Sequence, residues 1–229
     1  MSYNVTVSGK DYSGVSQVKL PIKYGDGAYA VFVADADVEM GKVLDGSIEN
    51  LSNDKVTELC GYALASHNKL KSVSLPNVVT VNGFAFDSCF ALTDVNLPKA
   101  KDTWYNNIFY KCTSLVNIEL PNTSDIGQKM FCDCTALKKV DIGRTTPNTK
   151  GSIAVMALTV ASALEALIIR CPFVVTLANV NAFDSSGIKA GTGYIYVPST
   201  LVDSYKAATN WSTFANQIRA IEDYPDICG

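Results

Sequence analysis

The chain has 229 residues, of which 48% are hydrophobic and 18% charged, and its formal net charge is −3. This composition excludes a disordered chain, because it provides enough apolar material for a substantial core. The small negative net charge does not indicate a positively charged surface that would bind nucleic acid or an anionic membrane. We therefore expect one or two folded domains that bind no nucleic acid.

The sequence carries no targeting signal that we can identify. Its first residues, MSYNVTVSGKDYSG, lack the basic and apolar regions of a secretory signal peptide. No apolar run approaches the roughly 18 to 20 residues of a membrane span, so we expect no membrane insertion. Seven cysteines are an odd number, which argues against a framework in which every cysteine forms a disulfide.

Residues 1–45 contain three β-branched or aromatic runs, at 4–9, 15–22 and 28–35. Turn-forming residues separate these runs, so they predict two or three antiparallel strands. The segment forms either a small separate domain or a cap over the N-terminal end of the repeats described below. An acidic run at 35–39 could bind a hard cation, but we interpret it as a solvated turn.

The stretch 70–142 repeats one phrase four times, as LKSVSLP, LTDVNLP, LVNIELP and LKKVDIG. The leucines that open these copies are spaced by 22, 23 and 22 residues. A second phrase precedes the last three copies, as FDSCFAL, FYKCTSL and FCDCTAL. A degenerate copy covers 46–69, and irregular copies continue to 198 after an insertion near 144–150. A period of this size with one short β phrase per unit indicates a solenoid.

Alternation along each β phrase predicts which side chains face the core. Apolar residues such as Leu70, Val73 and Leu75 point inward, and Pro76 and its equivalents end each strand because proline lacks an N–H. The residues between them point outward and form a ladder on one parallel sheet. The outward residues are Ser72, Ser74, Asp94, Asn96, Asn117, Glu119, Lys139 and Asp141.

After Pro198 the pattern becomes helical. Ser199 is expected to cap a helix with Leu201, Tyr205 and Ala208 on one face. Trp211 is expected to seal the last coil, and the run IRAIED to add a terminal strand. The chain therefore divides into an N-terminal β module or cap (1–45), a solenoid (46–198) and a C-terminal helix and cap (199–229).

The repeat resembles the BspA-type leucine-rich repeat, whose consensus runs roughly LxxIxIPxxVxxIGxxAFxxCxx. The match is close at 81–86 and Cys89 in the second unit and at Ile126-Gly127 in the fourth, whereas Trp104 departs from it in the third. The resemblance covers about residues 48–222. It implies an α+β, mostly β fold: a short leucine-rich-repeat solenoid with a parallel strand ladder, an N-terminal β module and a C-terminal helical cap.

The resemblance also implies a non-enzymatic role in recognition or structure. The phrase YSGVSQVKLPIKYGDGAYAVF resembles short β modules of phage virion proteins. Our first hypothesis is therefore a virion component of a phage tail or capsid surface, which binds a host surface or partner protein through the repeat face. The alternative is a secreted or surface bacterial adhesin. Expected partners are a protein or glycan on a cell surface, or other virion proteins, and a homo-oligomer is expected, with a trimer as the starting hypothesis.

Cys89, Cys112 and Cys134 are spaced by 23 and 22 residues and fall in one inward column. Zinc needs four ligands that converge at about 2.3 Å, which a column with steps of about 5 Å cannot supply. We interpret these thiols as small apolar core groups. His67 is the only histidine and falls in the same column, where packing is favoured over catalysis. We expect no catalytic residue, metal or cofactor.

The outward ladder is the best candidate for a binding face, since short polar side chains on a rigid sheet can hydrogen-bond a glycan or a protein. The alternative is that these positions are polar for solubility alone. Tyr105 and Tyr110 add candidate aromatic anchors, which are common in interfaces.

Overall fold

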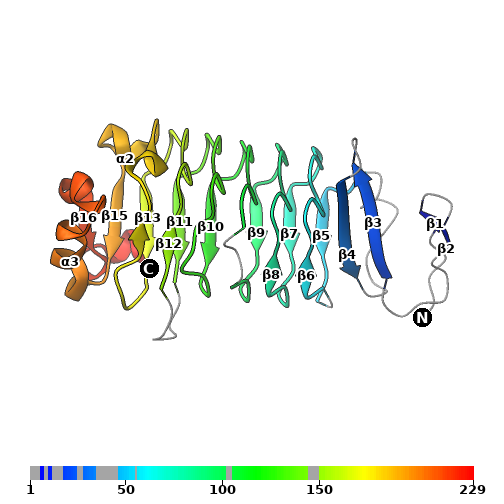
Figure 1. The fold of residues 1–229 in the computed structure, drawn as a ribbon, viewed down its shortest axis with the longest axis horizontal. Coiled ribbons are helices and arrows are strands. Elements are labelled where there is room, and N and C mark those ends of the chain that lie inside the picture. Colours follow the sequence, from blue (N-terminus) through cyan, green and yellow to red (C-terminus); the bar gives the residue numbers. More distant parts are fainter. Residues whose placement is uncertain are drawn as a thin grey trace.

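The computed structural model describes residues 46–54, 56–101, 105–143 and 150–229 in full, and the backbone of four strands before them. The repeats form coils that lie side by side in an elongated solenoid, with the N-terminal strands at one end and the C-terminal helices at the other (Figure 1). The acidic run at 35–39, Trp104 and residues 144–149 of the insertion lie outside the described residues.

Four N-terminal strands are present where two or three were expected, and three of them fall in the predicted runs, while the second does not. They are β1 (Thr6–Val7), β2 (Lys10–Asp11), β3 (Val18–Tyr24) and β4 (Ala28–Ala34). β1 pairs antiparallel with β2, and β3 with β4. β4 also pairs antiparallel with the first coil through Phe32 and Leu59. The β3–β4 hairpin therefore extends a sheet of the solenoid, while the division of the chain at 45 and 198 stays a prediction.

The β phrases form parallel strands in register, as the alternation predicts. Equivalent inward positions pair between neighbouring strands, as in Val73 with Val95 and Val140 with Leu167. We call the outer surface of these strands the long-strand face. Its strands are β5 (Asn50–Ser52), β7 (Ser72–Ser74), β9 (Asp94–Asn96), β10 (Asn117–Leu120), β11 (Lys139–Ile142), β13 (Ala166–Ile169), β15 (Tyr194–Val197) and β16 (Ile218–Ala220).

A second set of parallel strands, each of two residues, forms another side of the coil. These strands are β6 (Glu58–Leu59), β8 (Thr80–Val81), β12 (Ser152–Ile153) and β14 (Thr176–Leu177). β6 pairs with β8 and β12 with β14, and a single bridge joins Ile126 to Ile153. The coil thus has two sheet sides, and the third side carries the FDSCFAL phrases.

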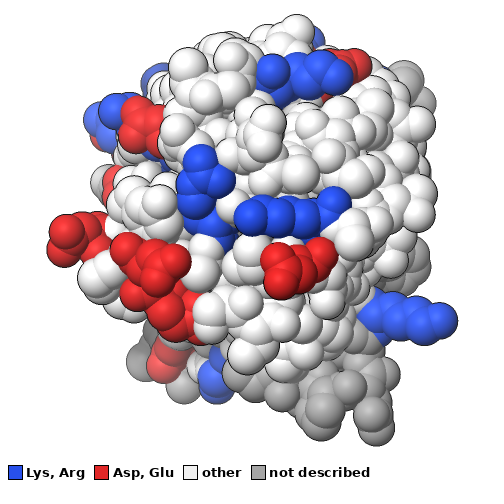
Figure 2. Space-filling model, turned by 90° about the vertical axis from the view of Figure 1, so that its left-hand side faces the viewer, with Lys and Arg blue, Asp and Glu red and all other residues white. Residues whose placement is uncertain are grey.

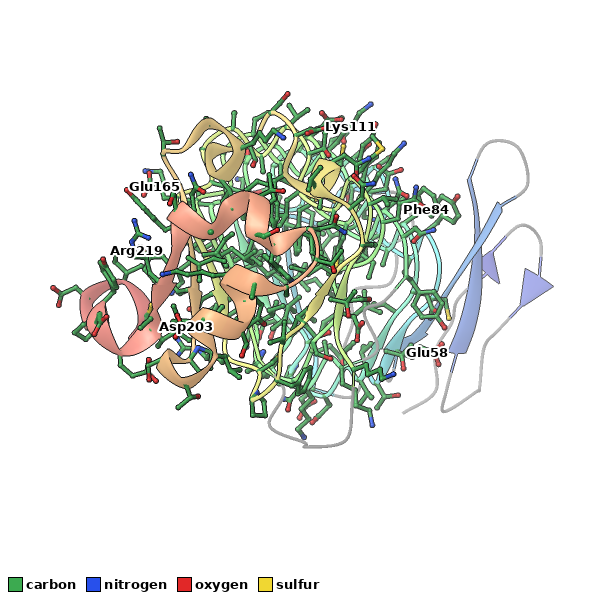
Figure 3. The ribbon with its side chains drawn as sticks, turned by 60° about the vertical axis from the view of Figure 1, so that its left-hand side comes forward. Glu58, Phe84, Lys111, Glu165, Asp203 and Arg219 are labelled. Carbon is green, nitrogen blue, oxygen red and sulfur yellow. The ribbon has the colours of Figure 1, made fainter. Side chains whose placement is uncertain are left out.

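The third side, here called the arc, is a ladder without strands. It comprises residues 60–67 and the equivalent 82–89, 105–112, 127–134 and 154–161. In each arc alternate N–H groups donate to the next coil, as from Leu64 to Ala85 O (2.8 Å) and from Phe86 to Ile108 O (2.9 Å). The intervening N–H groups donate three residues back, as from Ala85 to Asn82 O (3.3 Å). Every coil is therefore tied to its neighbour along the arc. Figure 3 shows Phe84 and Lys111 projecting from this edge, on a different side from Glu165.

The alternation in the arc requires left-handed backbone at two residues of most coils. Tyr62 and Ser66 have φ of 62° and 61°, and Met156 and Val160 have φ of 58° and 61°. This conformation costs a residue other than glycine roughly 1–2 kcal/mol. The hydrogen bonds between coils offset that cost.

The inward columns form the core. The ring of Phe109 stacks between Phe86 (5.0 Å between centroids) and Phe131 (5.5 Å), nearly parallel to both. Cys89, Cys112 and Cys134 are fully buried beside them. The predicted assignment of inward residues is confirmed at these positions.

The C-terminal region closes the solenoid with short helices. They include η1 (Val180–Phe183), α2 (Gly187–Ala190), η2 (Ser199–Leu201), α3 (Val202–Ala207), η3 (Trp211–Gln217), η4 (Ile221–Asp223) and α4 (Pro225–Cys228). The predicted helix is split into η2 and α3, and the expected capping role of Ser199 is wrong. Its side chain caps nothing, because Ser199 is already the first residue of η2, and its N–H donates to Glu222 Oε2 (2.9 Å).

Three cap side chains take the place of a further coil on β14. Val175 N–H donates to Tyr205 Oη (2.9 Å), and Trp211 Nε1 donates to Val175 O (2.7 Å). Asn210 Nδ2 donates to Leu177 O (2.8 Å). The last short strand therefore keeps its backbone hydrogen bonds. Seen from this end, a few acidic and basic groups lie near one another on a largely uncharged surface (Figure 2).

Candidate binding face

The N-terminal part of the long-strand face is a ladder of short polar side chains, as the sequence predicts. Ser72 Oγ donates to Asn50 Oδ1 (2.7 Å), and Asn96 Nδ2 donates to Ser74 Oγ (3.0 Å). Asp94 and Asn96 are exposed, and the two serines are partly exposed. Because neighbouring coils fix these side chains, the face presents a rigid set of donors and acceptors.

The long-strand face is interrupted between β9 and β10. Among the described strands, one sheet ends at β9 and the next begins at β10, with no ladder between them. Figure 1 shows the arcs running on without a break, while β9 and β10 stand visibly further apart than their neighbours. Val95 is only partly buried here, whereas the equivalent Val73 and Ile118 are 2% and 1% exposed. The interruption opens toward the core.

A cleft of about 560 Å³ lies over this interruption. We call it the β9–β10 cleft. It brings together six of the predicted site residues, all from the polar ladder. Its lining includes Ser72, Ser74, Asp94, Asn96, Asn117 and Glu119, with Thr93, Val73, Val95, Pro98, Val116 and Pro121.

The other predicted ladder residues lie elsewhere on the face. Lys139 is partly buried and pairs with Glu119 (3.1 Å). Asp141 is only 7% exposed, so its expected position on an open face is wrong. Its carboxylate receives two donors from Arg170, Nε (2.9 Å) and Nη2 (2.8 Å). Arg170 Nη2 also donates to the carbonyl oxygen of Cys228 in the C-terminal helix.

The C-terminal segment covers the long-strand face around β13 and β15. Cys228 packs with Ala166, Ile168 and Tyr196 in a small apolar cluster separate from the main core. The ring of Tyr224 meets that of Tyr196 edge to face at 5.3 Å. This part of the face is therefore occupied by the chain itself. This coverage could have been predicted from the sequence, since β13 and β15 carry apolar or aromatic residues at their outward positions.

The two candidate tyrosines do not join the cleft. Tyr105 and Tyr110 both lie in the arc, on another side of the coil. Tyr105 is partly buried against the core, and Lys111 Nζ lies 5.0 Å from the centre of the Tyr110 ring. A single partner surface cannot include these rings and the β9–β10 cleft unless it wraps around the coil.

The cysteine column has the chemistry of core packing. The thiols donate to carbonyl oxygens of the preceding coil, Cys89 to Leu64 O (3.1 Å) and Cys112 to Phe86 O (3.2 Å). Burial raises the pKa of Cys89 to about 12 and that of Cys112 well above the ordinary value. His67, 1% exposed, lies with Nδ1 3.1 Å from Ala65 O. A neutral buried thiol is a poor nucleophile and a poor metal ligand.

Neither a metal centre nor a membrane span emerges from the described part of the chain. Within it, no group of three or more His, Cys, Asp or Glu side chains could hold an ion. Within the same residues, no helix combines the length and apolar character needed to cross a membrane. All seven cysteines lie in the described ranges, and each is a free thiol rather than half of a disulfide.

The stacked parallel strands, the inward leucine and phenylalanine columns and the mostly β content define a leucine-rich-repeat solenoid protein. Residues 46–153 match the family model described as "BspA type Leucine rich repeat region", in six copies. This repeat region therefore belongs to the BspA type, as the resemblance implies. The coils extend beyond the match, since β13 and β15 continue the same sheet.

Among solved structures, the chain is similar to a leucine-rich repeat protein from Bacteroides ovatus, with 17% sequence identity and a TM-score of 0.28. The match covers 76% of this chain and 58% of that protein, so the chain spans less than two thirds of its length. None of the curated proteins matches the sequence. Leucine-rich repeats generally mediate protein interactions and are generally non-enzymatic.

Proposed function

We propose that this protein is a non-enzymatic recognition protein that binds its partner through the β9–β10 cleft and the adjoining polar ladder. The observation that carries the proposal is the contrast within one face. Around β13 and β15 the face is apolar and covered by the C-terminal segment. Around β7, β9 and β10 it is polar, exposed and hollowed. Solubility alone explains polar side chains but not a cleft at an interrupted sheet.

The mode of binding follows from the rigidity of the ladder. Side chains already held by neighbouring coils lose little conformational entropy when they bind a partner. Asn96 Nδ2, for example, donates to Ser74 Oγ of the preceding coil at 3.0 Å. A face of this kind suits recognition of a surface by several hydrogen bonds.

Two settings follow for this recognition. The first is a phage virion, in a trimeric tail or capsid-surface protein that binds a host surface or another virion protein; the resemblance of the N-terminal β phrase supports it. The second is a bacterial adhesin, and the family match favours it, since BspA-type proteins are typically surface-exposed or secreted. Mass spectrometry of purified virions and of cell-surface fractions separates the two, and light scattering measures the oligomeric state.

The face itself is tested by introducing positive charge on its surface. The double variant Asn96→Arg/Asn117→Arg places two long cations in the cleft, and binding of the labelled protein to intact bacterial cells is then titrated. The matched control is Asn68→Arg/Asn106→Arg, which changes two asparagines that are also exposed but lie outside the cleft. We expect at least a tenfold loss for the cleft variant only. Equal binding by both variants would show that this face does not bind the partner.

A further inference from the structure

We propose that the β9–β10 cleft is a binding site for a neutral saccharide. This inference rests on the proposed function and names the ligand class of the same site. It draws on three observations: how the cleft is formed, which polar groups line it, and where its apolar surface lies.

The cleft is a wedge that is closed along the arc and open on the long-strand face. At the arc, Phe86 N–H donates to Ile108 O (2.9 Å) and Ser88 N–H to Tyr110 O (2.8 Å), so the two coils are fully joined there. At the ends of the strands, Asn122 Nδ2 donates to Pro98 O (2.6 Å). Between these points the described strands β9 and β10 share no ladder.

In a parallel sheet each strand bonds to both neighbours, so the interruption leaves the facing edges of β9 and β10 without ladder partners. Their N–H and C=O groups are available to a ligand or to water. The cleft volume of about 560 Å³ lies within the range of roughly 300–1,000 Å³ that is typical of small-ligand sites.

The polar lining excludes anionic ligands and suits a polyol. Its charged side chains are Asp94 and Glu119, and no lysine or arginine is among the lining residues. The nearby Lys139 is engaged in an ion pair with Glu119 (3.1 Å), so phosphates, nucleic acids and sialylated or sulfated glycans find no unpaired cation in the lining. Carboxylates accept hydrogen bonds only, whereas the amides of Asn96 and Asn117 both donate and accept. Vicinal sugar hydroxyls can donate to the carboxylates and can both donate to and accept from the amides. Hydrogen bonds to a carboxylate are stronger than those to a neutral amide.

The apolar lining argues against a purely cationic ligand. Val95, which is partly exposed, and the rings of Pro98 and Pro121 give the cleft a C–H wall beside the carboxylates. A pyranose ring has hydroxyl groups at its edge and C–H groups on its face, so it can satisfy both kinds of lining. A lysine-rich peptide would meet the two carboxylates but would leave the apolar wall uncovered.

The saccharide assignment is tested on a printed array of neutral oligosaccharides terminating in glucose, galactose, mannose or an N-acetylhexosamine. Sialylated and sulfated glycans and an oligolysine peptide are printed on the same array. The proteins applied are the parent chain, Asp94→Asn, Asn117→Ala and the control Asn106→Ala. Asp94→Asn is close to isosteric, and Asp94 is exposed, so the fold is expected to survive.

We expect the parent and Asn106→Ala to bind at least one neutral glycan, and Asp94→Asn and Asn117→Ala to bind it at least tenfold more weakly. No neutral glycan bound by the parent, equal binding by all four proteins, or preference for anionic glycans or oligolysine would each overturn the saccharide assignment.

A second measurement separates this inference from the proposed function. Mild periodate cleaves vicinal diols on bacterial cells and leaves most protein surfaces intact. If Asn96→Arg/Asn117→Arg abolishes cell binding but periodate does not, the result supports the binding face and contradicts the saccharide assignment. If the arginine variant binds cells as well as the parent does, the result contradicts the proposed function too. Loss of binding in both experiments supports both claims.

Discussion

The C-terminal cap predicts a specific effect of removing one hydroxyl group, in the substitution Tyr205→Phe. Tyr205 is completely buried, and its oxygen accepts the N–H of Val175 at 2.9 Å. Phenylalanine fills the same space but cannot accept that bond. The substitution therefore leaves a buried backbone donor unsatisfied at the edge of β14 without creating a large cavity.

The cost of an unsatisfied buried donor is about 1–3 kcal/mol. We expect Tyr205→Phe to lower the free energy of unfolding by about 2 kcal/mol, measured by urea denaturation. Because repeats can open locally, hydrogen exchange gives the sharper readout. If the loss is local, exchange of the Val175 amide is expected to accelerate by roughly tenfold for each 1.4 kcal/mol, while amides of the arc at 82–89 keep their rates.

The control for this prediction is Tyr62→Phe. The Tyr62 ring is partly exposed and stacks on Phe84 at 4.6 Å, a contact that phenylalanine retains. Its effect should stay within about 0.5 kcal/mol. If Tyr205→Phe behaves like this control and the Val175 amide exchanges at the parent rate, the cap does not act through hydrogen bonds to β14.

Three further substitutions test other parts of the structure. Val160→Asn should raise the free energy of unfolding by about 1 kcal/mol, measured by urea denaturation. Val160 has φ of 61°, and asparagine tolerates that conformation better than valine. A lower free energy of unfolding would contradict the reasoning. Cys89→Ala should reduce the loss of folding stability at alkaline pH. The thiol has a pKa near 9 in the unfolded chain and about 12 in the folded one. Ionisation therefore favours the unfolded chain as the pH rises between these values, and lowers the free energy of unfolding by up to about 1.4 kcal/mol per pH unit. An unchanged slope would refute this. Arg170→Ala removes the contacts to Asp141 and to the carbonyl oxygen of Cys228. A thiol reagent should then modify Cys228 at least tenfold faster than in the parent. Equal reactivity in both proteins would show that Arg170 does not hold the C-terminal segment in place.

Much of the fold follows from the spacing of Leu70, Leu92, Leu115 and Leu137. That spacing sets the coils, and the period of two within each phrase sets inward and outward side chains. The cysteine column follows in the same way, because a fixed period places equivalent residues above one another. The strands β3 and β4 were predictable from β-branched runs bounded by turn residues, whereas the two-residue strand β2 was not.

The arc was not predictable from local preference. Among its left-handed positions, only Asn107 and Asp133 carry residue types that favour positive φ, whereas the others, such as Tyr62 and Val160, do not. The hydrogen bonds between coils select the conformation, so it is a property of the stack rather than of the segment.

The candidate site was only partly predictable. The polar ladder on β7, β9 and β10 followed from alternation, but the burial of Asp141 depends on Arg170 and on the C-terminal helix, which are remote in sequence. The cleft was not predictable, because the alternation within each β phrase does not show where neighbouring strands fail to pair.

The most direct test of the recognition face is hydrogen exchange of the protein bound to a bacterial cell-envelope extract. We expect slower exchange in peptides that cover 93–98 and 115–121, where the edges of β9 and β10 face each other. The arc at 60–67 and the covered strands β13 and β15 should keep their free rates. Protection confined to the arc or to the C-terminal cap, with β9 and β10 unchanged, would contradict binding through the β9–β10 cleft.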